Sequence, residues 1–278
     1  MRFGVALGRL NPAFHVEAAI EAERLGFESV WLPEHLVFPV ALAGSPHPGA
    51  DHPPVPAETP VFDAFAYLSF LAGRTSRIRL GTHVYLMGLR HPFVAARAVQ
   101  TLDVVSGGRA EVGVGAGWLE TEWQAAGLGF RSRGRRLDEA IHVCKRLWSE
   151  AVVEHHGEFF DFEAVRFEPK PTQRPWPPLH VGGESEAALR RAARVGEGWI
   201  GLEHTAESVC RPIERLHTLR ARTETADGDF CVTVGAAEPS RREVERLADA
   251  GVDRVIVCPW RRSPDATAGL AAFADAVF

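Results

Sequence analysis

The sequence is poor in the features that mark secreted, membrane and nucleic-acid-binding proteins. It has four cysteines in 278 residues, and none of Cys144, Cys210, Cys231 and Cys258 forms a close pair with another. We interpret them as buried, reduced thiols. No apolar stretch is long enough to span a bilayer, and the amino end starts its first predicted strand at once, without a hydrophobic secretion segment. The expected location is therefore the cytoplasm.

A surplus of positive charge is missing as well. The formal net charge is -5 and no sustained basic stripe occurs, which argues against binding to nucleic-acid phosphates. Low-complexity segments and fixed-period repeats are also absent. The remaining composition, 46% hydrophobic and 24% charged, is that of a globular protein able to bury one large core. We expect one domain covering residues 1–278.

Strand and helix patterns alternate along the chain. After a short apolar run, Asn11 favours the start of a helix and Gly26 its end, and Ser185 and the pair Ser240 and Glu243 mark two later helix starts. Strands are expected at residues 2–8, 28–32, 77–84, 110–114, 178–181, 199–202, 230–235 and 254–258. Eight strand and helix units predict an α/β fold, the (β/α)8 TIM barrel, in preference to a doubly wound sheet.

Two long segments interrupt the alternation. Residues 33–60 follow the second strand, and residues 151–177 lie between the fourth helix and the fifth strand. Long segments in a compact domain usually form lids or binding walls. The first segment begins at the carboxyl end of a strand, so it is the better lid candidate.

Several short segments stand where strands are expected to end. They are residues 33–35, 83–85, 115–118, 182–185 and 259–260. In a (β/α)8 barrel the carboxyl ends of all strands meet at one face, which carries the chemistry. We expect these segments to form one site.

A series of motifs runs along the chain at residues 81–82, 90–92, 101–103, 106–109, 113–118, Glu122, 133–139, 169–171, 177–178, 182–183 and 198–199. In this order the series resembles the bacterial luciferase-like monooxygenase family and, more narrowly, its coenzyme F420-dependent oxidoreductase branch. The resemblance covers nearly the whole chain up to the sixth strand. It implies a flavin-type or deazaflavin cofactor, a small-molecule substrate and a homodimer. The resemblance identifies the family more clearly than it distinguishes F420 from FMN as the cofactor.

The resemblance suggests where the phosphate tail of such a cofactor would bind. Gly182 and Gly183, followed by Ser185 as a helix cap, would offer backbone N–H groups and the positive end of a helix dipole. A plain strand-to-helix turn would explain the same two glycines.

The flat ring of the cofactor would rest on two other segments. The segment His83, Val84 and Tyr85 aligns with a bulge that commonly contains a non-proline cis peptide in this family, and we place that bond at His83–Val84. An ordinary strand end is the alternative. The segment Gly115-Ala116-Gly117 would let the cofactor pass close to the backbone, unless its glycines only relieve crowding at the rim. Trp118 is either a stacking wall or ordinary packing.

Glu34 and His35 match an acidic residue and histidine near the reactive ring face in related deazaflavin enzymes. An imidazole titrates near neutral pH and can act as a general acid, although a lone histidine is more often structural. Both residues are therefore candidate catalytic residues.

The basic residues indicate a site less specifically than Glu34 and His35 do. Arg90 and His91 are possible site members, and His91 is equally explained as a helix-entry residue before Pro92. The cluster Arg131, Arg133, Arg135 and Arg136 is either solvated surface or a partner for the glutamate tail of F420.

Three classes of function remain from the sequence. The first is hydride transfer between F420 and a small organic substrate. The second is an FMN-dependent monooxygenase supplied by a flavin reductase. The third, a metal hydrolase using His35, His47, Asp51 and His52, is disfavoured because three of these lie in a Pro-rich loop and no HExxH spacing occurs. We expect no metal site. A cofactor-free binding protein would reveal itself by binding neither FMN nor F420.

Overall fold

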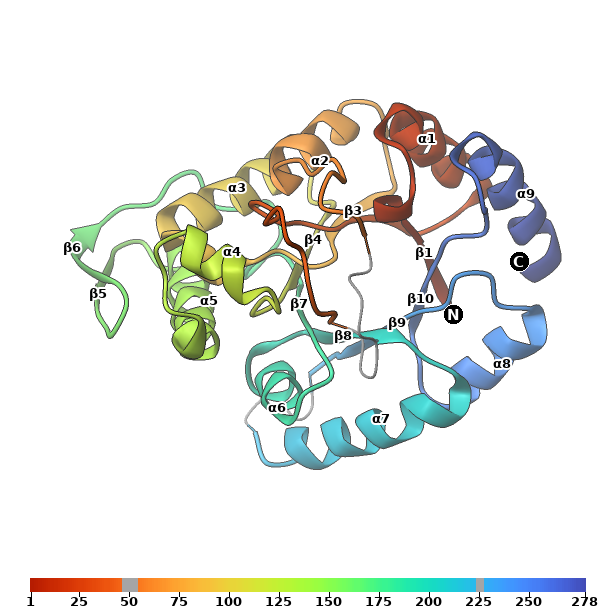
Figure 1. The fold of residues 1–278 in the computed structure, drawn as a ribbon. Helices are drawn as coiled ribbons and strands as arrows, with labels where there is room; N and C mark the ends of the chain where they lie inside the picture. The colour runs from red at the N-terminus through yellow and green to blue at the C-terminus, as the bar shows by residue number, and fades with distance from the viewer. Residues whose placement is uncertain (47–54, 224–227) are drawn as a thin grey trace.

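The computed structural model describes residues 1–46, 55–223 and 228–278, and it shows a closed barrel of parallel strands surrounded by helices (Figure 1). The barrel strands are β1 Arg2–Ala6, β2 Ser29–Leu32, β3 Arg79–Thr82, β4 Ala110–Val114, β7 Leu179–Gly182, β8 Gly198–Glu203, β9 Cys231–Gly235 and β10 Arg254–Val257. Their order around the barrel is β1-β10-β9-β8-β7-β4-β3-β2. The predicted (β/α)8 fold is confirmed, and each predicted strand overlaps an observed one.

Long helices follow the barrel strands and cover the outside of the sheet (Figure 1). They are α1 His15–Leu25, α2 Ala64–Ala72, α3 Pro92–Val105, α5 Arg133–Ser149, α6 Glu186–Val195, α7 Ala206–Arg220, α8 Arg241–Asp249 and α9 Ala266–Val277. The later predicted helix boundaries are confirmed, whereas Asn11 caps the 3-10 turn Pro12–Phe14 directly before α1. Ser185 accepts a hydrogen bond from the Ala188 N–H, Ser240 and Glu243 form a capping box, and Gly26 ends α1 with a φ of 92°.

Shorter elements connect these units. They are the helix α4 Glu120–Ala125 and the 3-10 turns η1 Leu7–Arg9, η2 Pro12–Phe14, η3 Met87–Leu89, η4 Phe130–Ser132 and η5 Ser263–Asp265. Among the described residues, no helix combines the length and apolar character needed to cross a membrane.

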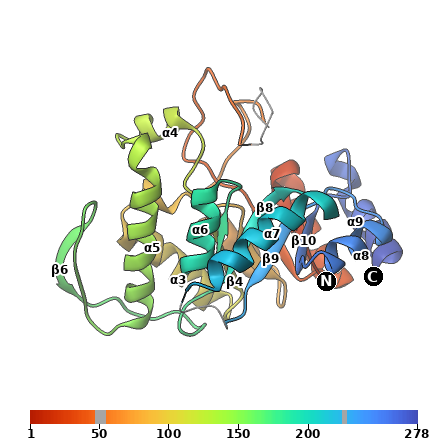
Figure 2. The ribbon, with the colours of Figure 1, turned by 90° about the horizontal axis from the view of Figure 1, so that it is seen from below.

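The second long segment contains a hairpin that the sequence pattern did not predict. Its strands are β5 Val153–His156 and β6 Asp161–Val165, and they form an antiparallel pair outside the barrel. Figures 1 and 2 both show this hairpin beyond α5, away from the barrel. Glu139 of α5 fixes it, since its carboxylate accepts hydrogen bonds from the N–H groups of Phe159 and Phe160. Most residues of both strands are exposed or half-buried, so they lack the apolar alternation that identifies a strand.

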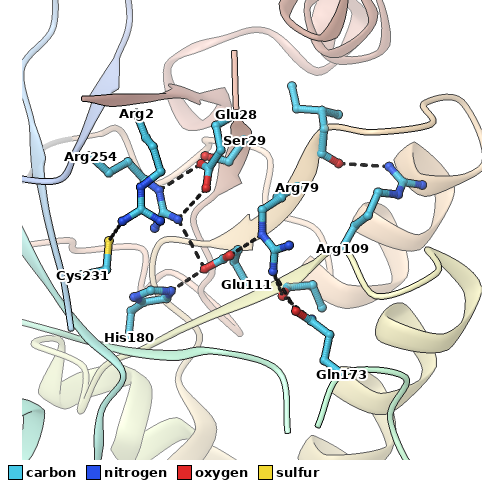
Figure 3. Close-up of polar contacts among 12 residues, drawn as sticks. Arg2, Glu28, Ser29, Arg79, Arg109, Glu111, Gln173, His180, Cys231 and Arg254 are labelled. Carbon is cyan, nitrogen blue, oxygen red and sulfur yellow. Dashed lines mark hydrogen bonds and ion pairs between the residues drawn. The ribbon is translucent and has the colours of Figure 1, made fainter. Parts of the chain in front are cut away.

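The lumen of the barrel is filled at its amino end. The fully buried Trp31 ring lies so close to β1 and β3 that a Cβ at Gly4 or Gly81 would come within 2.5 Å or 2.4 Å of it. A layer of charged residues lies beneath, where Arg254 and His180 contact Glu111 (Figure 3). Filling this end leaves the carboxyl face for a site.

Candidate active site

Four of the five predicted segments lie together at the carboxyl face. They follow β2, β3, β4 and β7, which are consecutive strands of the barrel. Val84 shows how close the segments after β3, β4 and β7 are, because a Cβ at Gly115 would lie 2.5 Å from one Val84 methyl and a Cβ at Gly182 would lie 2.8 Å from the other. The fifth segment, residues 259–260, follows β10, which is two strands beyond β2, and Trp260 packs against the main core.

The segment after β3 has the predicted backbone. The peptide bond between His83 and Val84 is cis. Tyr85 then returns to the sheet, since its N–H donates to the Gly113 carbonyl at 2.7 Å and its carbonyl accepts from the Gly115 N–H at 3.1 Å. Val84 therefore occupies the space that side chains at positions 115 and 182 would need. This contact gives both glycines a packing role, which for Gly115 is the crowding alternative stated above and for Gly182 is a role that the sequence did not suggest.

Glu34 connects the end of β2 to the segment after the cis bond. Its buried carboxylate forms an ion pair with Arg90 and accepts a 2.8 Å hydrogen bond from the Leu86 N–H. The Arg90 guanidinium also lies 4.5 Å from the centre of the Tyr85 ring, within cation–π range. Both Glu34 oxygens thus serve the protein itself, so its contacts are those of a residue that positions the site.

His35 faces a different neighbour. Its Nδ1 lies 3.0 Å from Glu122 Oε2 in α4, while the other Glu122 oxygen accepts from the Leu36 N–H at 2.6 Å. The Glu122 residue is 1% exposed. A carboxylate oxygen accepts hydrogen bonds, so Nδ1 is the ring nitrogen whose N–H faces Glu122, and Nε2 is the ring nitrogen outside this pair. Phe38 and Trp118 flank the imidazole, with ring centres 4.6 Å and 6.0 Å away.

The role of Glu122 was not predicted from the sequence. It lies within the quoted motifs, but its partner is 87 positions away and no local pattern connects the two residues. A glutamate two residues into a short helix is usually exposed. Here both oxygens accept N–H groups from the β2 loop, which makes its burial possible.

His83 is a neutral part of the site. Burial lowers the pKa of its imidazole to about 4, because the charged form loses its hydration. Its ring lies edge-to-face with Trp31 at 6.5 Å between centres. His83 therefore offers a polar but uncharged surface at physiological pH.

The turn after β7 only partly fits the expected phosphate site. Gly183 has a φ of 121°, but its N–H donates to the Ile200 carbonyl at 3.2 Å and is not free for a ligand. The Glu184 carboxylate accepts from the Leu202 N–H at 2.7 Å and lies 3.2 Å from His204 Nε2, so its charge is held against β8. The Gly183 N–H is therefore not a free donor for a phosphate, whereas the start of α6 at Ser185 is as expected.

The basic residues have mostly structural contacts. Arg133 donates to the Gly117 carbonyl of the segment after β4 at 3.2 Å, and Arg136 donates to the Gly88 carbonyl of η3 at 2.8 Å. Arg135 forms an exposed ion pair with Glu158 of the hairpin. His91 caps α3 by accepting from the Phe93 N–H, as the helix-entry alternative predicted.

The metal-hydrolase alternative gains no support. Within residues 1–46, 55–223 and 228–278, no group of three or more histidine, cysteine, aspartate or glutamate side chains is arranged to hold a metal ion. His47, Asp51 and His52 lie outside the described residues.

The fold and the position of the site are those of a (β/α)8-barrel enzyme. Residues 1–275 match the family described as Luciferase-like monooxygenase, and the chain belongs to this family. It is 33% identical over 223 residues to the F420-dependent glucose-6-phosphate dehydrogenase of Kineococcus radiotolerans, covering 77% of this chain and 60% of the relative. It is 31% identical over 188 residues to the FMNH(2)-dependent dimethylsulfone monooxygenase of Pseudomonas putida, covering 66% and 50%.

A solved structure gives the same result for the fold. The coenzyme F420 dependent tetrahydromethanopterin reductase of Methanopyrus kandleri superposes with a TM-score of 0.78 over 99% of this chain and 98% of that chain. The sequence identity is 16%, so this likeness concerns the barrel alone.

Proposed function

We propose that this protein transfers a hydride between coenzyme F420 and a small organic substrate. The observation that carries the proposal is the convergence of the β3, β4 and β7 ends at Val84, with the end of β2 joined to them through Glu34 and the Leu86 N–H. His35, which follows Glu34, is paired with Glu122. The named activity of the Kineococcus relative, which is F420-dependent, supports the choice of coenzyme.

The residues present suit a deazaflavin. Val84 and the glycines against it form an apolar, side-chain-poor surface suited to a flat ring, and the uncharged His83 lies next to it. Ser185 and the first turn of α6 would hold the phosphate, since unpaired N–H groups at a helix start bind anions. Gly115, Ala116, Gly117 and Trp118 would border the ring. When bound, F420 supplies the carbon that accepts or gives the hydride.

His35 would donate or accept the proton that accompanies hydride transfer. In reduction of a carbonyl group, the substrate carbon gains the hydride and the substrate oxygen gains a proton. His35 in its protonated form would donate that proton from Nε2, and in the reverse direction the neutral form would accept it. Glu122 keeps Nδ1 protonated throughout, because it accepts a hydrogen bond from that nitrogen at 3.0 Å. Glu34 would act by holding the ring-bearing segment, through Arg90 and the Leu86 N–H.

An FMN-dependent monooxygenase is the second candidate. The relative from Pseudomonas putida is named for FMNH(2), and an apolar surface of this kind suits either ring. This function would require a partner reductase to supply reduced flavin.

Parallel titrations with F420 and with FMN distinguish these candidates. We expect saturable one-to-one quenching of F420 fluorescence and much weaker binding of FMN. The reverse order of affinity would favour the monooxygenase. Binding of neither molecule would contradict both proposals. Light scattering on the same sample tests the homodimer that the family resemblance suggests.

A further inference from the structure

A cavity of about 270 Å³ opens between the loop after β2 and the turn after β4. One side is formed by Ala41, Ala43, Gly44 and Ser45, and the other by residues 118–121. Figure 2 shows the β2 loop and α4 at the same end of the molecule. Gly44 lies against the indole of Trp118, because a Cβ there would be 3.8 Å from the ring.

The lining of the cavity selects one kind of ligand. Its wall is made largely of alanine, glycine, leucine and tryptophan, with hydroxyl groups at Ser45 and Thr121. Glu120 adds a carboxylate, and no cationic side chain is among the described lining residues. Such a wall favours an apolar molecule with a hydrogen-bond donor and opposes an anion. It is therefore unsuited to the phosphate or the carboxylates of F420.

One short turn connects the cavity to His35 and Glu122. Trp118 lines the cavity and also lies edge-to-face with the His35 ring at 6.0 Å. Four residues later, Glu122 binds His35 and the Leu36 N–H. A molecule in the cavity would contact the same turn that fixes His35.

We propose that this cavity binds the second reactant, a small, mainly apolar, neutral or cationic molecule that carries a hydrogen-bond donor. The proposal rests on the proposed function, because it divides the site between an anionic coenzyme over β3, β4 and β7 and a neutral or cationic reactant between the β2 and β4 loops. Its volume is slightly below the range typical of drug-sized ligands, which indicates a compact reactant.

Two fluorescent probes with the same skeleton test this inference. N-phenyl-1-naphthylamine is neutral and has one N–H donor, and 1-anilinonaphthalene-8-sulfonate differs by an added sulfonate. We expect one-to-one binding of the neutral probe to the purified protein, at least roughly tenfold tighter than the sulfonate, because like charges placed together at a site cost several kcal/mol. Glu120→Gln should reduce that preference.

Ala43→Trp locates the probe. This substitution at an exposed position of the cavity wall should weaken binding of the neutral probe by roughly tenfold or more, as expected when a side chain fills the pocket. Ala272→Trp, the same change on the exposed side of α9, should leave it unchanged. Neither variant should change the affinity for F420 or FMN, measured separately.

Three outcomes would overturn the inference. Equal binding of the two probes would show that the cavity does not select against anions. Unchanged binding in Ala43→Trp would place the probe elsewhere, and competition between the probe and the coenzyme would show a shared site. Failure of coenzyme binding with the probe pattern intact would instead contradict the proposed function.

Discussion

Glu122 binds two successive residues of another loop, accepting hydrogen bonds from His35 Nδ1 at 3.0 Å and from the Leu36 N–H at 2.6 Å. Glu122→Gln tests this relationship, because the glutamine amide has one accepting oxygen and its NH₂ group would face one of the two donors. We expect a loss of about 1–3 kcal/mol in the free energy of unfolding, the cost of a buried donor left unpaired. Chemical denaturation measures this change, and ¹⁵N NMR of the His35 imidazole should show protonated Nδ1 in the native chain. Glu245→Gln on the exposed face of α8 is the control.

His35→Ala should abolish most of the activity and leave the fold intact. A positioned general acid contributes about 10²–10⁴-fold to the rate, so the turnover number should fall by roughly that factor. Circular dichroism and the affinity for coenzyme should change little. A variant with native turnover would remove His35 from the mechanism.

Glu34→Ala should destabilise the protein strongly. It leaves the mostly buried Arg90 guanidinium without its carboxylate, and removing one partner of a buried ion pair costs about 3–5 kcal/mol. The double variant Glu34→Leu with Arg90→Met should recover much of that loss, because no unpaired charge remains. A recovered fold that still binds coenzyme poorly would identify the pair as a positioning element, whereas native binding would make it purely structural.

Gly115→Ala should lower the free energy of unfolding, because the added methyl would be too close to Val84. The new methyl would lie 2.5 Å from Val84 Cγ2, and overpacking of this kind costs about 1–3 kcal/mol. Adding Val84→Ala should relieve part of the cost. Gly73→Ala is the matched control, since its Cβ would meet only the Phe70 carbonyl at 3.5 Å. Thermal unfolding of the three variants measures the difference.

Stability should rise with pH through two windows. Burial alone would raise the pKa of Glu111, but His180, Arg254 and Arg79 lower it from 4.5 to about 2. The stabilisation from this lowered pKa is complete above pH 4.5 and is lost as the pH falls toward 2. The pKa of His83 is lowered from 6.5 to about 4, so between these values the unfolded chain binds the proton more readily and stability again falls with falling pH.

Denaturation curves across the two windows check this prediction. Glu111→Gln should flatten the dependence between pH 2 and 4.5, and His83→Asn that between pH 4 and 6.5. A slope in the upper window that persists in His83→Asn would assign the effect to another group.

The sequence predicted the barrel because its signals are local. Helix starts at Ser185 and Ser240 and the end at Gly26 depend on neighbouring residues only, and the structure has them as expected. The resemblance located the cis bond at His83–Val84. The partners of Glu34 and His35 could not be predicted from the sequence. Arg90 is 56 positions from Glu34 and Glu122 is 87 positions from His35, and each belongs to another strand and helix unit. The β5 and β6 hairpin was missed because its contacts with Glu139 replace an apolar pattern.

The Trp31 ring and the charged residues beneath it fill the amino end of the lumen. The coenzyme and the substrate of the proposed reaction must consequently both enter at the carboxyl face. Because the surface around Val84 and the cavity between the β2 and β4 loops lie at different places on that face, neither molecule has to wait for the other, and steady-state kinetics should follow a random order of binding.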